Sequence, residues 1–388
     1  MVPEGWEQNT LKAVLDRIID YRGQSVPKAK TGIPLITARN VRKGYLDFSN
    51  AEFIDENQFD SWMTRGNPRK GDILFTTEAP LGNACRFPDN GTYAVGQRTV
   101  TLRCGENLDS EFLLYSLLSE KGQQSIEIRS SGSTAKGIKS SELKKVKFTY
   151  PKSVPEQKKI AKILQTWDRA IANTEKLIDA SKQQNKALMQ QLLTGKKRFA
   201  GFEGEWGKVE LRECVTFLNG TRKPIKQEER AKIQGDIPYY GATGIIDYVE
   251  NYIFDDELIL LGEDGENILS RALPHVFVIQ GKAWVNNHAH VMKALPGIDT
   301  NYLCMYLENL DYRRFNSGSA QPKINKAICE KIPVQIPTLP EQKKISDSLK
   351  CAEKKISSQM AKLKKLKQEK KALMQQLLTG KRRVKIDD

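Results

Sequence analysis

Two long stretches of the chain place apolar residues at alternating steps of four and three, the spacing of a coiled-coil helix. In the first stretch these residues are Ile160, Leu164, Trp167, Ile171, Ile178, Leu188 and Leu192. In the second stretch they are Ile345, Leu349, Ile356, Leu363, Leu366, Leu373 and Leu377. Polar residues on the same seam, such as Asn185, Gln359 and Lys370, would weaken the helix pair but fix its register. The pattern predicts two helices of about 38 residues, each roughly 57 Å long at 1.5 Å per residue.

Both predicted helices carry matching signals at their ends. Ser153 and Glu156 form a Ser-x-x-Glu capping box, and Thr338 and Glu341 form its counterpart. Each box contains a proline, in the first helical turn, where a missing N–H costs nothing. Each helix is predicted to end at a Thr-Gly pair that is followed by basic residues, as helix C-termini prefer.

The two helices belong to an internal repeat that runs along the whole chain. The stretch KALMQQLLTGKKR begins at Lys186 and returns at Lys371 with a single change. PEQKKI occupies 155–160 and 340–345, so both repeated segments share an offset of 185 residues. The repeat therefore predicts two helices with nearly identical surfaces.

Outside the helices the two halves of the chain are less alike. A segment from Gly132 resembles one from Gly318, one residue out of step, while Trp6 has a counterpart in Trp206 and Leu11 in Leu211. Each half thus contains a variable domain followed by a nearly constant helix. Because a domain separates the helices, an antiparallel pair is the economical arrangement, and it would relate the variable domains by an approximate two-fold rotation.

The variable domains show mixed secondary-structure patterns. Short strand-like runs such as DILFTT, YAVGQRTVTLRC, LILLG and HVFVIQG lie between Gly, Asn and Asp turns, and helical patterns begin at Ser110 and Asn301. We therefore predict an α+β fold with two pseudo-symmetric globular domains of mixed α/β structure and an antiparallel coiled coil. The expected division is 1–152 and 199–337 for the domains, and 153–198 and 338–388 for the helical regions.

The net charge of +15 is concentrated in the helical regions. Residues 155–200 hold 10 basic and 4 acidic residues, and residues 340–388 hold 15 basic and 6 acidic residues. This excess indicates a polyanionic partner, although a solvated helix face is the alternative. The six cysteines are scattered, which suits a reducing compartment and argues against structural zinc. Without a signal peptide or a long apolar run, we expect a soluble, cytoplasmic protein with no membrane segment.

No catalytic motif is evident in the sequence. It contains neither a phosphate-binding loop nor a glycine motif for a dinucleotide or S-adenosylmethionine. Glu263, Asp264 and Glu266 are a possible Mg²⁺ site, but a tight Gly-Asp-Gly turn explains them better. His288 and His290 share one face of a strand but have no evident third metal ligand. We expect no catalytic residue, metal or cofactor in this chain.

Other polar residues have the chemistry that reads DNA bases. Arginine pairs with guanine, Asn or Gln with adenine, and a carboxylate accepts from cytosine. Glu78 lies in one such polar segment, although ordinary loop polarity is the alternative for all of them. The candidate DNA-binding residues are Arg39, Asn40, Arg42, Lys43, Thr76, Thr77, Gln97, Arg98, Lys136, Tyr239, Tyr240, Glu263, Asp264, Asn286, Asn287, His288 and Lys323.

The whole pattern, with Pro-Glu-Gln opening both helices at 155–157 and 340–342, resembles the specificity subunit of a type I restriction-modification system. The resemblance implies that each variable domain recognises one half of a bipartite site in double-stranded DNA. It also implies that the helices set the gap and dock two modification subunits. Those partners would carry S-adenosylmethionine and methylate adenine, and restriction subunits would use ATP and Mg²⁺ to translocate and cut DNA. The rival hypotheses are a self-sufficient nuclease or methyltransferase and a coiled-coil scaffold.

Overall fold

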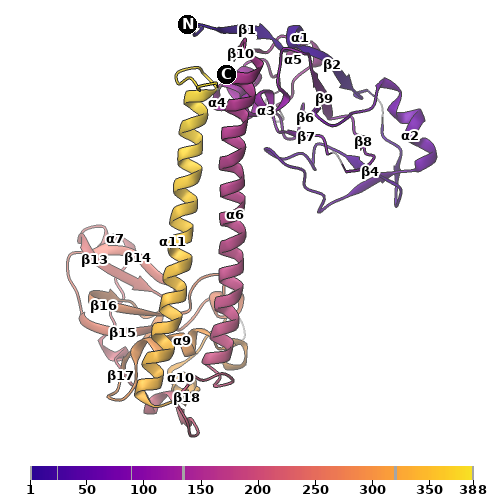
Figure 1. Ribbon diagram of the computed structural model, residues 1–388. Helices are drawn as coiled ribbons and strands as arrows, with labels where there is room; N and C mark the ends of the chain where they lie inside the picture. The colour runs from indigo at the N-terminus through magenta and orange to yellow at the C-terminus, as the bar shows by residue number, and fades with distance from the viewer. Residues whose placement is uncertain (1, 24, 89, 133–135, 319–320, 387–388) are drawn as a thin grey trace. The chain divides into compact units, whose positions relative to one another are not determined.

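In a computed structural model the chain forms two compact units, each containing one mixed α/β domain and parts of both long helices (Figure 1). Unit 1 comprises Met1–Glu175 and Ala361–Asp388, and unit 2 comprises Lys176–Met360. The structure describes residues 2–23, 25–88, 90–132, 136–318 and 321–386. The α+β fold predicted from the sequence is confirmed.

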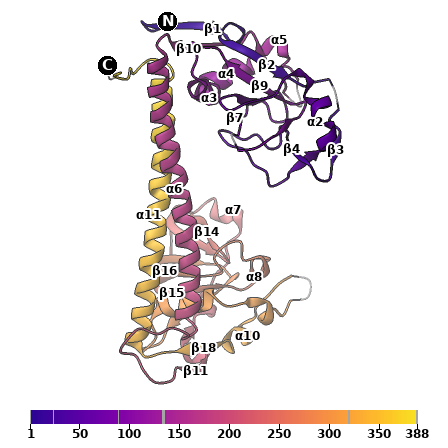
Figure 2. The same cartoon turned by 45° about the vertical axis from the view of Figure 1, so that its right-hand side comes forward.

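The two long helices are α6 (Val154–Leu192) and α11 (Leu339–Leu377), and each is 39 residues long (Figure 2). Within each unit the α6 segment packs beside the α11 segment in antiparallel orientation. In unit 1 the start of α6 meets the residues after α11, through Glu156 and Arg383. In unit 2 the start of α11 meets the residues after α6, through Glu341 and Arg198.

The helix seam is buried or half-buried at every predicted apolar position. Fully buried members are Ile160, Leu164 and Leu377 in unit 1, and Leu192, Ile345 and Leu349 in unit 2. These side chains belong to the cores that also hold domain residues, so each domain is joined to its helix segments by continuous apolar packing.

At the start of α6, one half of the predicted capping box is confirmed. The hydroxyl of Ser153 accepts from the backbone N–H of Glu156 at 3.4 Å, as the first part of the box requires. The carboxylates of Glu156 and Glu341, however, accept hydrogen bonds from Arg383 and Arg198. The local pattern predicts that each carboxylate binds the N-terminus of its own helix. In the structure it binds an arginine that follows the opposite helix.

The glutamine of each Pro-Glu-Gln motif ties the helix start to its domain. Gln157 is fully buried; its amide donates to the carbonyls of Pro151 and Asn107, and its oxygen accepts from the N–H of Asp109 at 2.7 Å. Gln342 is bonded in the same way to the equivalent parts of unit 2. The motif is therefore a structural joint between helix and domain.

The unit 1 domain contains two small four-stranded sheets and a separate antiparallel strand pair. The pair is β1 (Trp6–Thr10) with β10 (Lys147–Pro151). One sheet has the order β2 (Leu15–Asp20), β9 (Thr99–Cys104), β6 (Ile73–Thr76), β7 (Ala84–Arg86), and the other β3 (Lys28–Ala29), β5 (Glu52–Ile54), β4 (Ile33–Ile36), β8 (Ala94–Val95). The helices are α1 (Leu11–Val14), α2 (Glu56–Trp62), α3 (Ser110–Leu118), α4 (Glu120–Glu127) and α5 (Ser140–Leu143).

The unit 2 domain has one six-stranded sheet and a matching strand pair, β11 (Gly207–Glu210) with β18 (Pro333–Ile336). The sheet order is β12 (Val215–Phe217), β17 (Ala289–Ala294), β15 (Phe254–Gly262), β16 (Val276–Val285), β13 (Gln234–Gly241), β14 (Gly244–Val249). The helices are α7 (Gln227–Arg230), α8 (Asn267–Ser270), α9 (Thr300–Glu308) and α10 (Lys326–Glu330). The strand pair recurs in both domains, whereas the sheets differ.

The tryptophans that the sequence repeat pairs lie in equivalent surroundings. Trp6 packs edge-on against Phe112 with ring centroids 6.2 Å apart, and Trp206 packs in the same way against Tyr302 at 6.4 Å. Gly195, which follows α6 with φ of 69°, lies against the ring of Trp206, and a side chain there would be strained by this left-handed backbone conformation.

Candidate nucleic-acid interface

In unit 1, β6 ends beside two other chain segments. Directly after the strand, the N–H of Thr77 donates to the carbonyl of Arg98 at 3.0 Å, and its carbonyl accepts from the N–H of Ile138 at 2.9 Å. Glu78 then forms an isolated β-bridge with Gly137. This strand end therefore gathers residues that are far apart in the sequence.

Unit 2 repeats this backbone arrangement at the end of β15. The N–H of Glu263 donates to the carbonyl of His288 at 2.8 Å, and its carbonyl accepts from the N–H of Ile324 at 2.8 Å. Asp264 forms an isolated bridge with Lys323. The two strand ends are thus built on the same backbone scaffold, although the residue types on them differ.

On each scaffold a carboxylate is paired with a nitrogen-containing side chain that is exposed. In unit 1, Nε of Arg98 is 3.0 Å from Oε1 of Glu78, and the two side chains are 55% and 47% exposed. In unit 2, Nδ1 of His288 is 2.9 Å from Oδ2 of Asp264, with exposures of 51% and 21%. Sequence reasoning named all four residues but did not pair them, since the partners lie 20 or more residues apart. The weak similarity between the DILFTTE and LILLGED segments was the available signal.

Several candidate residues in unit 1 gather at one hollow next to this strand end. A pocket of about 480 Å³ is lined by Arg39, Gln97 and Arg98, together with Lys28 and Glu52. Its charged and amide groups are of the kinds that bind phosphates and base edges. Lys43 is exposed elsewhere on the domain, and Lys136 forms an exposed ion pair with Glu127.

Other unit 1 candidates have their polar atoms occupied inside the domain. Asn40 is 1% exposed; its oxygen accepts from the N–H of Thr37, and its amide donates to the carbonyl of Asp47. Thr76 and Thr77 are also buried. Arg42 is half-buried and pairs with Asp47 at 3.3 Å. A DNA contact by these residues stays a prediction, and the buried ones would need the domain to open.

The unit 2 candidates divide in the same way. The buried members are Tyr239, whose hydroxyl accepts from the N–H of Ile225, and Asn286, whose oxygen accepts from the N–H of His288. Tyr240 is half-buried against Phe277, with ring centroids 6.0 Å apart. The exposed candidates on this domain are Asn287, His288 and Lys323.

A buried polar network supports the unit 2 strand end. The carboxylate of Glu263 accepts from Arg222 at 2.7 Å and lies 3.4 Å from Nζ of Lys323. Burial raises the pKa of Glu263, but Arg222, His290 and Lys323 together lower it by more, so the net shift of the pKa is downward. His290 is fully buried between the carbonyl of Ile324 and the amide of Asn219, and burial lowers its pKa. The sequence reading did not single out Arg222 or Asn219.

This network bears on the metal hypotheses. Glu263 is engaged by two cations, and Asp264 is engaged by His288. Across the residues that the structure describes, no group of three or more His, Cys, Asp or Glu side chains is arranged to hold a metal ion. Burial raises the pKa of the Cys85 thiol to about 12 and that of Cys214 to about 11, which makes both thiols poor nucleophiles.

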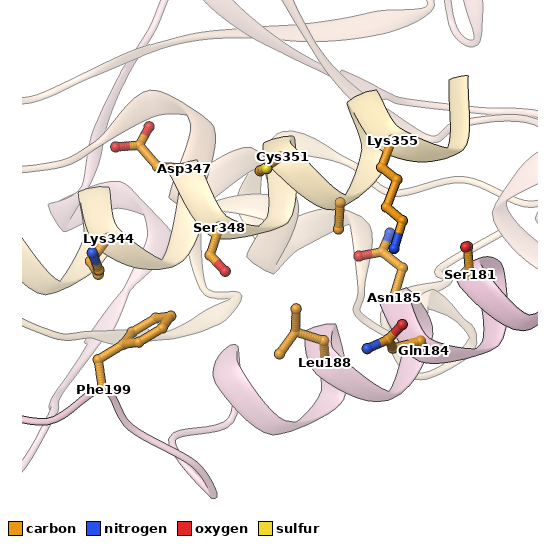
Figure 3. A pocket seen from close by; sticks show the side chains of 11 residues that line it. Ser181, Gln184, Asn185, Leu188, Phe199, Lys344, Asp347, Ser348, Cys351 and Lys355 are labelled. Atoms are coloured by element: carbon orange, nitrogen blue, oxygen red, sulfur yellow. The ribbon is translucent and has the colours of Figure 1, made fainter. Parts of the chain in front are cut away.

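A second hollow lies between the helices of unit 2. Figure 3 shows a pocket of about 550 Å³, with Leu188 of α6 and Phe199 on one side and Lys344, Ser348 and Cys351 of α11 on the other. Its lining holds a single carboxylate, so it lacks the paired acids of a hydrolytic site. No helix in the described part of the chain has the length and apolar character needed to cross a membrane.

Comparisons with known proteins agree over most of the chain. The family described as "Type I restriction modification DNA specificity domain" matches residues 3–182 and 203–368. A putative type I restriction enzyme specificity subunit of Haemophilus influenzae, S.HindORF215P, is 36% identical over 164 residues, which cover 42% of this chain and 39% of that protein. The putative MjaX specificity subunit of Methanocaldococcus jannaschii is 24% identical over 417 residues, covering 99% of this chain and 95% of that protein. Among solved structures, the S subunit from M. genitalium matches with a TM-score of 0.62 at 18% identity, covering 97% of this chain and 96% of that one.

Proposed function

The chain belongs to the family of type I restriction-modification DNA specificity subunits, and on this premise we propose that its two domains each read one half of an asymmetric, bipartite site in double-stranded DNA. Specificity subunits are the non-catalytic members of such complexes. The helices α6 and α11 would set the gap between the half-sites and dock two modification subunits. Assembly with restriction subunits follows from the same proposal. S-adenosylmethionine, ATP and Mg²⁺ would then be bound by the partners.

One observation carries this proposal. Both units use the same backbone scaffold at the end of β6 or β15, but the paired side chains on it differ, with Arg98 and Glu78 in one unit and His288 and Asp264 in the other. In contrast, the joints made by Gln157 and Gln342 repeat with the same residue types. A protein that presents one partner surface twice and reads two unrelated half-sites needs this combination.

The exposed candidates, together with the half-buried Gln97, are the residues we assign to DNA. They are Arg39, Lys43, Gln97, Arg98 and Lys136 in unit 1, and Asn287, His288 and Lys323 in unit 2. Arginine and lysine there would contact phosphates or guanine, and the amides would contact adenine. The basic excess of the helical regions supports contact with either DNA or acidic partner surfaces.

The proposal is tested by exchanging residues 1–154 with the corresponding domain of a specificity subunit that has a different target. The hybrid, coexpressed with the modification subunit, should methylate a site in which only one half has changed. A change in both halves would contradict the assignment of one domain to one half-site. A hybrid with an exchanged 201–339 segment is the matched control, since it should change only the other half.

A further inference from the structure

We propose that the two pairs, Glu78 with Arg98 and Asp264 with His288, are equivalent specificity elements, each reading one base pair in the major groove of its half-site. The inference rests on the proposed function and goes beyond it, because it assigns a position-specific role to four side chains. It starts from the structural match between the two strand ends.

The two strand ends match in their backbone hydrogen bonds. Thr77 and Glu263 each donate to the carbonyl of the residue that pairs with the carboxylate, Arg98 or His288, and each accepts from the N–H of an isoleucine. The residue that follows, Glu78 or Asp264, bridges to the loop before that isoleucine. The carboxylates and their partners therefore occupy corresponding places in two domains whose sheets are otherwise different.

Stability alone does not account for the repeated pairs. Exposed ion pairs contribute little to the folding free energy because water and salt screen them. The backbone hydrogen bonds at both strand ends do not involve these side chains. Both domains nevertheless place a carboxylate against a nitrogen base at this exposed position, which indicates selection for a ligand.

The atoms of the unit 1 pair complement a C·G base pair. In the major groove, cytosine presents its N4 amino group as a donor beside O6 and N7 of guanine, which are acceptors. Nε of Arg98 lies 3.0 Å from Oε1 of Glu78, and the other four N–H groups of the guanidinium are donors for guanine. Oε2 of Glu78 can accept from the cytosine amino group. An acceptor and a donor held 3.0 Å apart thus match the two edges of one base pair.

The unit 2 pair presents different atoms. Nδ1 of His288 lies 3.0 and 2.9 Å from the two carboxylate oxygens of Asp264 and donates to that carboxylate. The Asp264 oxygens keep further lone pairs that can accept. This pair therefore suits an exocyclic amino group, on adenine or cytosine. The difference between the pairs fits an asymmetric target.

The test uses the full chain coexpressed with its modification subunit and a genome-wide map of methylated sites. Glu78→Gln and Asp264→Asn keep the size of each side chain but change its hydrogen-bonding pattern. Glu78→Gln should reduce discrimination about ten- to a hundredfold at one C·G position of one half-site. Asp264→Asn should likewise reduce discrimination at one position of the other half-site, where the base is adenine or cytosine. Each variant controls for the other.

A further control removes an exposed ion pair between β15 and β17, away from the strand end. Asp256, near the start of β15, pairs with Lys293 of β17, and both side chains are exposed. Six residues separate Asp256 from the strand end at Gly262, a distance of about 20 Å along the strand. Asp256→Asn should leave every position of the motif unchanged.

The outcomes separate this inference from the proposed function. If the wild-type chain gives no split motif, the proposed function fails. If the wild type gives a split motif and Glu78→Gln weakens methylation equally at every position, the inference is wrong and the proposed function stands. A variant without methylation is examined as a purified complex by competition with duplexes substituted at single positions. Loss of affinity without a position-specific change would again overturn the inference.

Discussion

Arg383 and Glu156 form a bidentate ion pair, with Nε to Oε1 at 2.6 Å and Nη2 to Oε2 at 2.8 Å. Arg198 and Glu341 repeat it at 2.8 and 2.7 Å, and both carboxylates are almost fully buried. Each repeated helix thus brings a glutamate in its first turn and an arginine beyond its last. Because the helices run antiparallel, the start of one copy binds the end of the other, so duplication of the sequence supplies both ion pairs.

Removal of either arginine should destabilise the unit that contains it. Arg383→Ala leaves the buried carboxylate of Glu156 without its cation, and we expect a loss of about 1–3 kcal/mol in the free energy of unfolding. Arg198→Ala should have the same effect on unit 2. Urea denaturation measures both. Arg382→Ala and Lys197→Ala remove the same charge one residue away and should have little effect; equal losses in these controls would point to net charge as the cause.

The glutamine of the Pro-Glu-Gln motif should be as important as the glutamate. Gln157→Ala leaves the N–H of Asp109 and the carbonyls of Pro151 and Asn107 without their buried partner. A loss of about 1–3 kcal/mol follows from those unsatisfied groups. Thermal unfolding of Gln157→Ala is compared with that of Gln183→Ala, which changes an exposed glutamine on the same helix. Similar melting temperatures for the two variants would show that the joint is dispensable.

Unit 2 should lose stability in acid because of His275. Burial first, then the nearby Arg271 and His290 charges, lower the pKa of His275 from 6.5 to about 3. Below pH 6.5 this histidine is protonated in the unfolded chain but stays neutral in the folded chain. The free energy of unfolding therefore falls by about 1.4 kcal/mol per pH unit until about pH 3. At pH 5 this amounts to about 2 kcal/mol relative to pH 7.

His275→Phe should flatten this decline. The ring packs edge-on against Tyr312 with centroids 4.6 Å apart, a contact that phenylalanine can keep. Denaturation at pH 7 and pH 5 measures the difference for the wild type and the variant. His288→Gln, which replaces an exposed histidine, should retain the wild-type decline. A decline that is unchanged in His275→Phe would assign the acid sensitivity to other groups.

Two neighbouring candidates should separate structure from DNA binding. Asn40→Ala removes three buried hydrogen bonds and should cost about 1–3 kcal/mol of stability. Arg39→Ala, at an exposed position, should change stability by less than about 0.5 kcal/mol but weaken DNA binding. Thermal unfolding and a binding assay with the assembled complex measure the two effects. A stable Asn40→Ala complex with lower DNA affinity would reverse these roles.

The helices and the repeat could be predicted from the sequence because their signals are local. A seam of apolar residues, a capping serine and a terminal Thr-Gly pair each act within a few residues, and α6 and α11 have the predicted length. The helix from Ser110 likewise begins where its pattern indicates. Local patterns failed where a distant residue competes for the same group. The carboxylate of Glu156 binds Arg383, which is 227 positions away, and this contact could not be read from the capping-box pattern.

The candidate site was predictable only in part, for a similar reason. Arg39 and Asn40 are adjacent polar residues, and residue chemistry alone does not tell which one points outward. The fold buries Asn40 beneath its own turn and leaves Arg39 at a pocket. The pairing of Glu78 with Arg98 depends on the β6–β9 register and on the loop between them, neither of which the residue types specify.

The most direct test of the account is a methylation map by long-read sequencing, from a methylation-free host that expresses this chain with its modification subunit. The account predicts a split, asymmetric motif that is methylated only when both proteins are present. Methylation of a contiguous palindrome, or methylation that does not depend on this chain, would contradict it.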